Sequence, residues 1–386
     1  MNSTTVQPGV WAELIGQERV VTTLQRAVEG ERHAMTHAWL FTGPPGSGRS
    51  NAARAFAAAL QCDNRGCGSC RTCVTALSGA HPDVTVVRTE KLSIGVDEVR
   101  ELVRRAAMAP TLGRYQVLIV EDADRVTERG ADALLKAIEE PATRTVWLLC
   151  APTADDVIVT IRSRCRRVEL RTPPEAAVAE LLRRRDGIEP ELAAFAARAA
   201  QGHVGRARAL ARNEAARQTR TDILTLPQHL GSLSQCLDAA AQLVKRTGDE
   251  AAAITAELDA KELAELSEAL GMGTKGARPR SAQAALSALA DEQKLRAKRL
   301  QRDALDRVLT ELTSYYRDVL VAQTQAGSPI INAEFAEPIA DLAAHSTPSA
   351  TLRRLDAILA CRTALETNVA PLLAMEALMI GLARPH

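Results

Sequence analysis

Aromatic residues are scarce in this chain of 386 residues, at 3% of the sequence. Alanine and leucine dominate its hydrophobic residues instead, which favours helices. An excess of charge of either sign is also missing, because 48 lysines and arginines face 47 aspartates and glutamates. The resulting net charge of +1 excludes a globally basic protein, so any contact with nucleic acid must come from a local patch or through partners.

Long hydrophobic runs are absent, since none reaches the ~20 residues that a membrane-spanning helix needs. The first residues, MNSTTVQPGVWAEL, have neither a basic n-region nor an apolar h-region. We therefore expect no signal peptide, no contact with a membrane and a cytoplasmic location. Eight cysteines in a reducing compartment then favour metal binding or burial over disulfides.

The stretch LFTGPPGSGRSNAARAF, residues 40–56, follows the P-loop pattern G-x-x-x-x-G-K-[ST] at every position but one. An apolar run precedes it and a helical pattern follows it, as the motif requires. Arg49 stands where the pattern has lysine, and a planar guanidinium is not equivalent to a compact ammonium at a tight phosphate site. The sequence leaves open whether ATP or ADP, with Mg²⁺, still binds there. The candidate residues are Gly43, Pro44, Pro45, Gly46, Ser47, Gly48, Arg49 and Ser50.

Two acids, Glu121 and Asp122, end the hydrophobic run YQVLIVED. A strand end of this kind usually supplies an aspartate for the metal and then a glutamate for the attacking water. The inverted order displaces both carboxylates, and a misplacement of ~1 Å can cost roughly 10²-fold in rate. Two solvated acids at a strand end are the alternative.

Four cysteines fall within residues 62–73 with the spacing C-x4-C-x2-C-x2-C: Cys62, Cys67, Cys70 and Cys73. Four thiolates can close a tetrahedral Zn²⁺ site and leave no open position for catalysis. We therefore predict a structural zinc module, with an iron–sulfur cluster as the alternative.

Basic residues gather at two places. The stretch TIRSRCRRVEL, residues 160–170, includes Ser163 and Arg164. An arginine held at a domain edge can stabilise phosphate charge in a neighbour's active site, whereas the alternative is a solvated basic edge. The second place is a run that reads as one solvated helix face or, alternatively, as a contact to DNA: Lys294, Arg296, Lys298, Arg299 and Arg302.

Apolar strand-like runs alternate with helical segments through the first 170 residues, which predicts a parallel sheet covered on both faces. Strand patterns stop there. We expect an α/β domain over 1–170, a small helical lid over 171–213 and an all-helical domain over 214–386, with a linker at 271–281. The expected strands lie at 83–88, 115–122, 145–152 and 165–170, and the helices between them at 96–108 and 128–140.

Several of these stretches, in this order and spacing, resemble the bacterial clamp-loader subunits of the AAA+ family. The resemblance is dense over about residues 10–210, and the helical remainder is similar only in character. It rests on WAELIGQERVVTTLQRAV, HAWLFTGPPGSGRS, the four cysteines, DALLKAIEEPATRTVWLLCAP and SRC.

This family has an ATP-hydrolysing motor branch (gamma/tau) and a non-motor branch (delta-prime). Four departures from the motor pattern favour delta-prime: Arg49, the inverted acidic pair, Ala151-Pro152 in place of paired threonines, and Gly205 in place of an arginine, with Arg206 one residue later. The motif of Ser163, Arg164 and Cys165, through which the family donates an arginine to the next subunit, is intact.

The resemblance implies a subunit of a hetero-pentamer with gamma/tau and delta in the nucleoid-associated replisome. That assembly loads the sliding clamp of DNA polymerase III onto primer-template DNA. Arg164 would serve an adjoining motor's ATP site, and the C-terminal helices would form a collar. Two alternatives stay open: an active motor in which Arg49 and Asp122 do the chemistry, and a zinc-dependent DNA-binding module.

Overall fold

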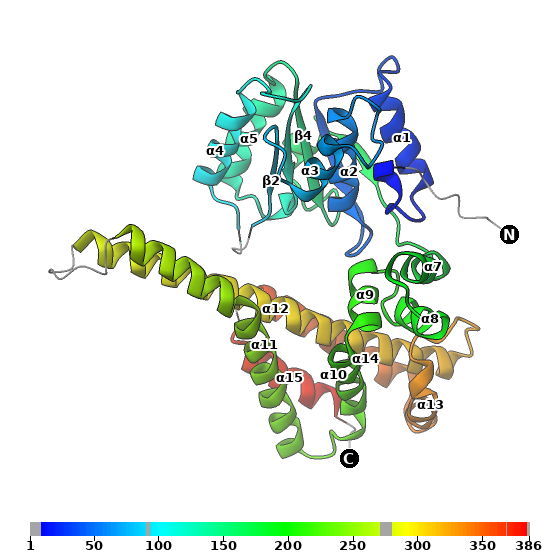
Figure 1. Cartoon of the computed structure of the whole chain (residues 1–386). Helices are drawn as coiled ribbons and strands as arrows, with labels where there is room; N and C mark the ends of the chain where they lie inside the picture. The colour runs from blue at the N-terminus through cyan, green and yellow to red at the C-terminus, as the bar shows by residue number, and fades with distance from the viewer. Residues whose placement is uncertain (1–8, 90–92, 271–279, 368, 384–386) are drawn as a thin grey trace. The chain divides into compact units, whose positions relative to one another are not determined.

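The computed structural model describes residues 9–89, 93–270, 280–367 and 369–383. The chain divides into two compact units, Met1–Asn213 and Glu214–His386 (Figure 1). The predicted linker at 271–281 falls mostly on 271–279, which lie outside the described residues. Among the described helices, none combines the length and the apolar character needed to cross a membrane.

A parallel sheet of five strands forms the centre of the first unit. Its spatial order is β2 (Val84–Val87), β3 (Gln116–Val120), β4 (Thr145–Ala151), β1 (Ala38–Thr42) and β5 (Arg166–Glu169). Thr42 at the end of β1 is level with Ala151 on β4 and with Glu169 on β5. The carboxyl ends of these strands therefore meet at one edge, which is where open α/β sheets place their ligands.

Helices cover both faces of the sheet, as Figure 1 shows. Along β1, the side chains of Trp39 and Phe41 pack toward one face and those of Ala38 and Leu40 toward the other, because neighbouring residues of a strand point to opposite sides. The first face is covered by α1 (Glu18–Val28), α2 (Arg49–Gln61) and α3 (Arg71–Ser78). The second is covered by α4 (Val96–Ala106), α5 (Glu128–Glu139) and α6 (Val159–Arg162).

Three short helices complete the first unit: α7 (Glu175–Asp186), α8 (Pro190–Ala199) and α9 (Val204–Arg212). They pack on one another through alanine and leucine side chains. Two single turns of 3-10 helix also belong to this unit, η1 (Gly9–Trp11) and η2 (Ala123–Arg125).

The second unit is entirely helical. Its two longest helices, α11 (Leu233–Ala269) and α12 (Arg280–Thr324), run side by side (Figure 1). A second hydrophobic core lies among them, with Leu309, Tyr315 and Met375 fully buried. The other elements of the unit are α10 (Glu214–Thr225), η3 (Leu226–Gln228), η4 (Ala333–Phe335), α13 (Ala336–Ala344), α14 (Pro348–Glu366) and α15 (Pro371–Leu382).

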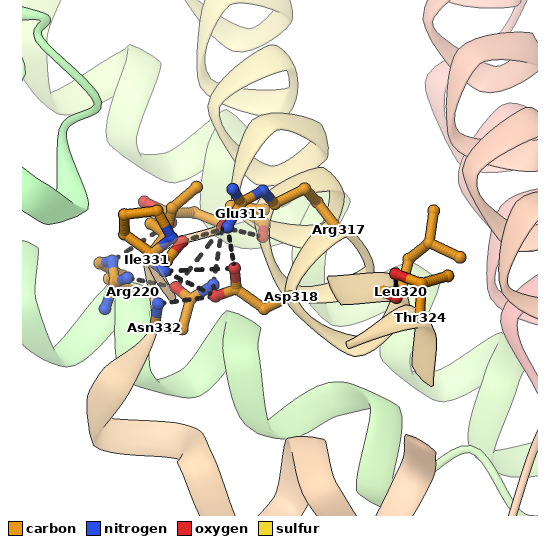
Figure 2. A network of polar contacts seen from close by, with 10 residues as sticks. Arg220, Glu311, Arg317, Asp318, Leu320, Thr324, Ile331 and Asn332 are labelled. Atoms are coloured by element: carbon orange, nitrogen blue, oxygen red, sulfur yellow. Dashed lines mark hydrogen bonds and ion pairs between the residues drawn. The ribbon is translucent and has the colours of Figure 1, made fainter. Parts of the chain in front are cut away.

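A buried polar network joins three segments of the second unit, as Figure 2 shows. Nε of Arg220 on α10 lies 3.2 Å from a carboxylate oxygen of Glu311 on α12. Asp318, also on α12, accepts hydrogen bonds from the backbone N–H of Ile331 at 3.0 Å and of Asn332 at 2.7 Å. Asn332 in turn accepts a hydrogen bond from Arg220. These contacts fix α10 and the loop before η4 to α12.

The predicted fold class is confirmed. The parallel sheet with helices on both faces, the group of four cysteines and the helical C-terminal half are all present. The expected strands after residue 80 lie within two residues of the observed ones.

Candidate functional site

The P-loop residues 43–50 connect β1 to α2 at the carboxyl edge of the sheet. Gly46 and Gly48 have φ of 82° and 92°, a region that favours glycine. A Cβ atom on Gly46 would also lie 2.6 Å from the Cα atom of His203 at the start of α9. The loop thus has the glycine-dependent backbone of its motif and packs closely against the small helical region.

Arg49, the residue in the lysine position, is directed onto the loop itself. Its Nη1 atom donates a hydrogen bond of 2.6 Å to the carbonyl oxygen of Gly43. Burial lowers the pKa of this guanidinium from its ordinary value, against the influence of Cys150 and of the Asp124 and Asp122 carboxylates. At least one donor of the cation is therefore used on backbone of the same loop.

Neighbouring groups hold the loop at both sides. The N–H of Gly43 donates to the carbonyl oxygen of Pro152 after β4, at 3.0 Å. Gln17, before α1, donates from Nε2 to the carbonyl oxygen of Arg171 at 2.6 Å and accepts from the N–H of Arg171 at 3.1 Å. The same Nε2 lies 3.3 Å from the carbonyl oxygen of Ser47. Gln17 was not among the predicted site residues, although it lies in the IGQ stretch that carries part of the resemblance.

Glu121, the first of the two acids, is paired with a cation of the same chain. Nε and Nη2 of Arg54, on α2, each lie 2.9 Å from Oε1 of Glu121. The Glu121 side chain is only 10% exposed. Arg54 also donates from Nη1 to the carbonyl oxygen of Leu77, at 3.4 Å. A guanidinium thus neutralises the carboxylate that follows β3, where a nucleotide-hydrolysing site would place a ligand for Mg²⁺.

The second acid, Asp122, lies 4.0 Å from Nε of Arg125. Burial raises the pKa of Asp124, two residues further on. At the end of β4, Ala151 and Pro152 contribute no polar side chain. At the start of α9, His203 accepts the N–H of Arg206 at 3.2 Å, and burial lowers the pKa of its imidazole.

The four predicted metal ligands do lie together, between the end of α2 and the start of α3. Their sulfur atoms are all within 4.8 Å of one another. Sγ of Cys62 lies 3.8 Å from that of Cys67 and 3.7 Å from that of Cys70. Four sulfurs at ~2.3 Å from one zinc ion would be about 3.8 Å apart, so the donor set fits zinc. Sulfurs this close surround a single ion more readily than a cluster of irons.

Backbone N–H groups donate to two of the four sulfur atoms, which suits thiolates around a bound cation. The N–H of Cys70 donates to Sγ of Cys67 at 3.4 Å, and such bonds lower the pKa of Cys67 to about 6. The N–H of Cys73 donates in the same way to Sγ of Cys70, which caps α3. The module is fastened to the start of the chain because the N–H of Val10 donates to the carbonyl oxygen of Gly66, at 3.0 Å.

Arg164, the candidate trans-acting arginine, follows α6 and has its side chain 40% exposed. Its Nη1 atom donates to the carbonyl oxygen of Thr160 at 2.8 Å and to Oγ of Ser163 at 3.1 Å. Its Nη2 atom lies 2.5 Å from Oε1 of Glu139, the last residue of α5. Burial raises the pKa of the neighbouring Cys165 thiol to about 12, so this thiol stays protonated and packs in the core.

Other arginines of the same stretch are bound within the chain. Arg162 forms an ion pair with Asp155. The guanidinium of Arg166 lies 5.2 Å from the ring centre of Trp39 and donates to the carbonyl oxygen of Ala34. Arg162, Arg164 and Arg166 therefore all have partners within the chain.

The basic run on α12 is largely neutralised by nearby acids. Arg296 forms ion pairs with Asp259 at 2.8 Å and Glu262 at 2.7 Å, both on α11. Lys294 and Arg299 each face an aspartate of α12 itself. The two pairs of Arg296 connect the two long helices. The side chains of Arg296 and Arg299 are largely buried, so these two residues do not belong to a solvated helix face.

Comparisons with known proteins point to one family. The family described as DNA polymerase III, delta subunit, matches residues 16–174. The DNA polymerase III subunit gamma/tau of Mycobacterium tuberculosis (strain ATCC 25618 / H37Rv) is 38% identical over 183 residues, which are 46% of this chain and 31% of that protein. The delta' subunit of Pseudomonas aeruginosa is 36% identical over 167 residues, 42% of this chain and 51% of that protein.

A solved structure of a DNA polymerase III gamma subunit-related protein from Thermotoga maritima aligns with 75% of this chain and 99% of its own. Its TM-score is 0.36 at 18% identity. The chain spans about a third of the length of the first curated relative described above and about half of the second.

The parallel sheet, its P-loop and the similarity over residues 16–174 together define a P-loop module of the AAA+ type. Over this stretch the chain is similar to the gamma/tau and delta' subunits of DNA polymerase III. Both gamma/tau and delta' subunits occur among its relatives, so similarity alone does not separate these two branches.

Proposed function

We propose that this chain is a non-motor subunit of the delta-prime kind, whose own P-loop does not hydrolyse ATP and whose Arg164 acts at a neighbouring motor's ATP site. It would assemble with gamma/tau and delta in a hetero-pentamer that loads the sliding clamp onto primer-template DNA. In this proposal the sheet with residues 1–170, the lid 171–213 and the collar 214–386 are its working parts, and Zn²⁺ on the four cysteines is structural.

The observation that carries the proposal is the ion pair of Arg54 with Glu121. A carboxylate that must bind Mg²⁺ has to be available to it, and here two N–H groups of one guanidinium lie on the same carboxylate oxygen. Arg49 adds to this, because it donates to Gly43 of its own loop. Glu121 and Arg49 thus both have partners inside the chain, which supports an idle centre, since catalysis of phosphoryl transfer depends almost entirely on positioning and charge.

The geometry of Arg164 supports the second half of the proposal. Its side chain is partly exposed, and contacts with Thr160, Ser163 and Glu139 hold it in a defined position. An arginine supplied by a neighbour is worth about 10³–10⁵ in rate at the site that it serves. A loosely solvated cation would not raise the rate of hydrolysis to the same extent, because the rate gain depends on a fixed position of the guanidinium.

The competing proposal is an active motor of the gamma/tau kind, which the 38% identity to such a subunit favours. In that case Arg49 would bind the phosphates and Asp122 the Mg²⁺. The two proposals differ in the activity of the isolated chain. Purified alone, a non-motor subunit shows no ATP turnover, whereas a motor shows turnover that Arg49→Ala abolishes.

The test of the first proposal uses the reconstituted assembly with gamma/tau and delta. Arg164→Ala should remove most of the turnover of the one motor site that it serves, and Arg49→Ala should leave total turnover unchanged. Arg167→Ala is the matched control, because Arg167 is an exposed arginine three residues further on. Normal turnover in the Arg164→Ala assembly would overturn the assignment of Arg164.

A further inference from the structure

Glu139 and Arg164 form an ion pair between two separate segments of the first unit. Oε1 of Glu139 lies 2.5 Å from Nη2 of Arg164, and the two side chains are 39% and 40% exposed. Glu139 is the last residue of α5, and Arg164 follows α6. Twenty-five positions separate them in the sequence, so the fold brings them together.

The position of Glu139 makes the pairing informative. A carboxylate at the C-terminal end of a helix is unfavourable, because the helix dipole places partial negative charge there. α5 nevertheless ends with Glu139 and Glu140 in succession. Glu139 has a cation that offsets this cost, while Glu140 is exposed and forms no ion pair in the described part of the chain.

The same contact restrains Arg164. Its Nη1 atom is bound to Thr160 and Ser163, and its Nη2 atom to Glu139, so both terminal nitrogens have partners within this chain. A carboxylate in contact with a guanidinium also reduces the attraction of that guanidinium for other anions, and repels a phosphate that approaches it. A phosphate group carries more charge than a carboxylate and can replace it on the same nitrogen.

We propose that Glu139 is a latch that holds Arg164 on its own chain and competes for it with the phosphates of the neighbouring motor's nucleotide. This inference rests on the proposed function of Arg164. Glu139 is then a restraining residue that touches neither nucleotide nor metal. Its effect is modest, because an ion pair with both partners partly exposed shifts an equilibrium by about 1.5- to 5-fold.

If Glu139 supported Arg164 in its action, removal of the Glu139 charge would lower ATP turnover. The latch predicts the opposite, a rise in turnover. Glu139→Gln keeps the shape of the side chain and removes its charge, so Arg164 is released more readily. In the reconstituted assembly, we expect kcat for ATP at the served site to rise about 1.5- to 5-fold, with a smaller change in KM, because the arginine acts on the transition state. The gain should shrink as salt rises, since salt screens an exposed ion pair.

The matched control is Glu140→Gln, which removes the same charge one residue further along and should leave kcat unchanged. In an Arg164→Ala background, Glu139→Gln should have no effect, because the latch then has nothing to hold. Glu139→Asp, which keeps the charge on a shorter side chain, should fall between wild type and Glu139→Gln. If the Glu139→Gln protein assembles poorly, the turnover of the Glu139→Asp assembly tests the same proposal.

The outcomes separate the two proposals. If Arg164→Ala lowers turnover but Glu139→Gln leaves it unchanged or lowers it, the latch is wrong and the role of Arg164 stands. If Arg164→Ala has no effect on turnover, the role of Arg164 is wrong and the latch falls with it. A gain with Glu139→Gln that persists in the Arg164→Ala background also contradicts the latch.

Discussion

Nε and Nη2 of Arg54 both lie 2.9 Å from Oε1 of Glu121, at the edge of the sheet where the P-loop begins. The pair joins α2, which follows the P-loop, to the end of β3. Through Leu77 the same guanidinium also reaches α3, which begins next to the four cysteines. One arginine thus connects the candidate nucleotide site to the candidate zinc module.

This relationship predicts a dependence on Mg²⁺ that appears only when Arg54 is removed. Arg54→Met leaves the largely buried Glu121 without its cation, and we expect a loss of about 1–3 kcal/mol in the free energy of unfolding. Millimolar Mg²⁺ should then raise the melting temperature of the variant, because a ligand that binds only the folded state stabilises it. The measurement is thermal unfolding with and without Mg²⁺.

Arg19→Met is the control, since Arg19 is exposed on α1 and forms no ion pair among the described residues. It should change neither stability nor the response to Mg²⁺. If wild type already gains as much from Mg²⁺ as the Arg54→Met variant, Glu121 is available to the metal and the idle site is in doubt.

The cysteine module predicts about one Zn²⁺ per chain, because four thiolates complete one tetrahedral site. Cys67→Ser should lower the zinc content to near zero and destabilise the segment between α2 and α3. Metal analysis of the purified chain measures the first effect and chelator-dependent melting the second. Cys165→Ser provides the comparison, since Cys165 lies outside the cluster. The Cys165→Ser protein should therefore keep the zinc content of wild type. A cluster variant with full zinc content would contradict the assignment.

The fold and the grouping of the four cysteines could be predicted because their signals are local in the sequence. Apolar runs ending at Thr42, Val120 and Ala151 define strands, and the spacing from Cys62 to Cys73 places four sulfurs on one turn and the start of a helix. Neither depends on distant residues, so the sequence pattern is sufficient.

The pairings that decide the chemistry could not be predicted in this way. Arg54 meets Glu121 across 67 positions, and Gln17 meets Arg171 across 154. Strand order and helix packing determine which residues become partners. Because arginines and acids are equally abundant in this sequence, many other pairings are compatible with the sequence alone. The sequence indicated that Arg49 and the acidic pair were unusual, but not that each had found a partner inside the chain.

Asp83 predicts a pH dependence of stability. Its buried carboxylate accepts the N–H groups of Thr111, Leu112 and Gly113 at 2.6, 2.8 and 2.6 Å. Burial alone would raise the pKa of Asp83, but these bonds outweigh it and hold the pKa below its ordinary value. The stability that this carboxylate contributes is therefore complete above about pH 4 and is lost as the pH falls through the lowered pKa.

Asp83→Asn should cost about 1–3 kcal/mol at neutral pH, because an amide offers one acceptor oxygen where the carboxylate offers two. The difference from wild type should narrow in acid, since wild-type Asp83 is then protonated as well. Urea unfolding at several pH values measures this. Asp63→Asn is the exposed counterpart, with a side chain 90% exposed. A difference that is independent of pH would show that the loss comes from packing and not from charge.

The buried network of the second unit gives the last prediction. Arg220 is 3% exposed and lies between Glu311 and Asn332 (Figure 2). Arg220→Met should destabilise the unit by about 3–5 kcal/mol, because it leaves the buried Glu311 carboxylate without its cation. Arg246→Met removes an arginine whose ion pair with Asp222 is exposed, and should cost less than about 1 kcal/mol. Urea unfolding of the full-length variants compares the two. Equal losses would mean that Arg220 contributes only as an exposed ion pair does, and that packing of the helices alone holds α10 on α12.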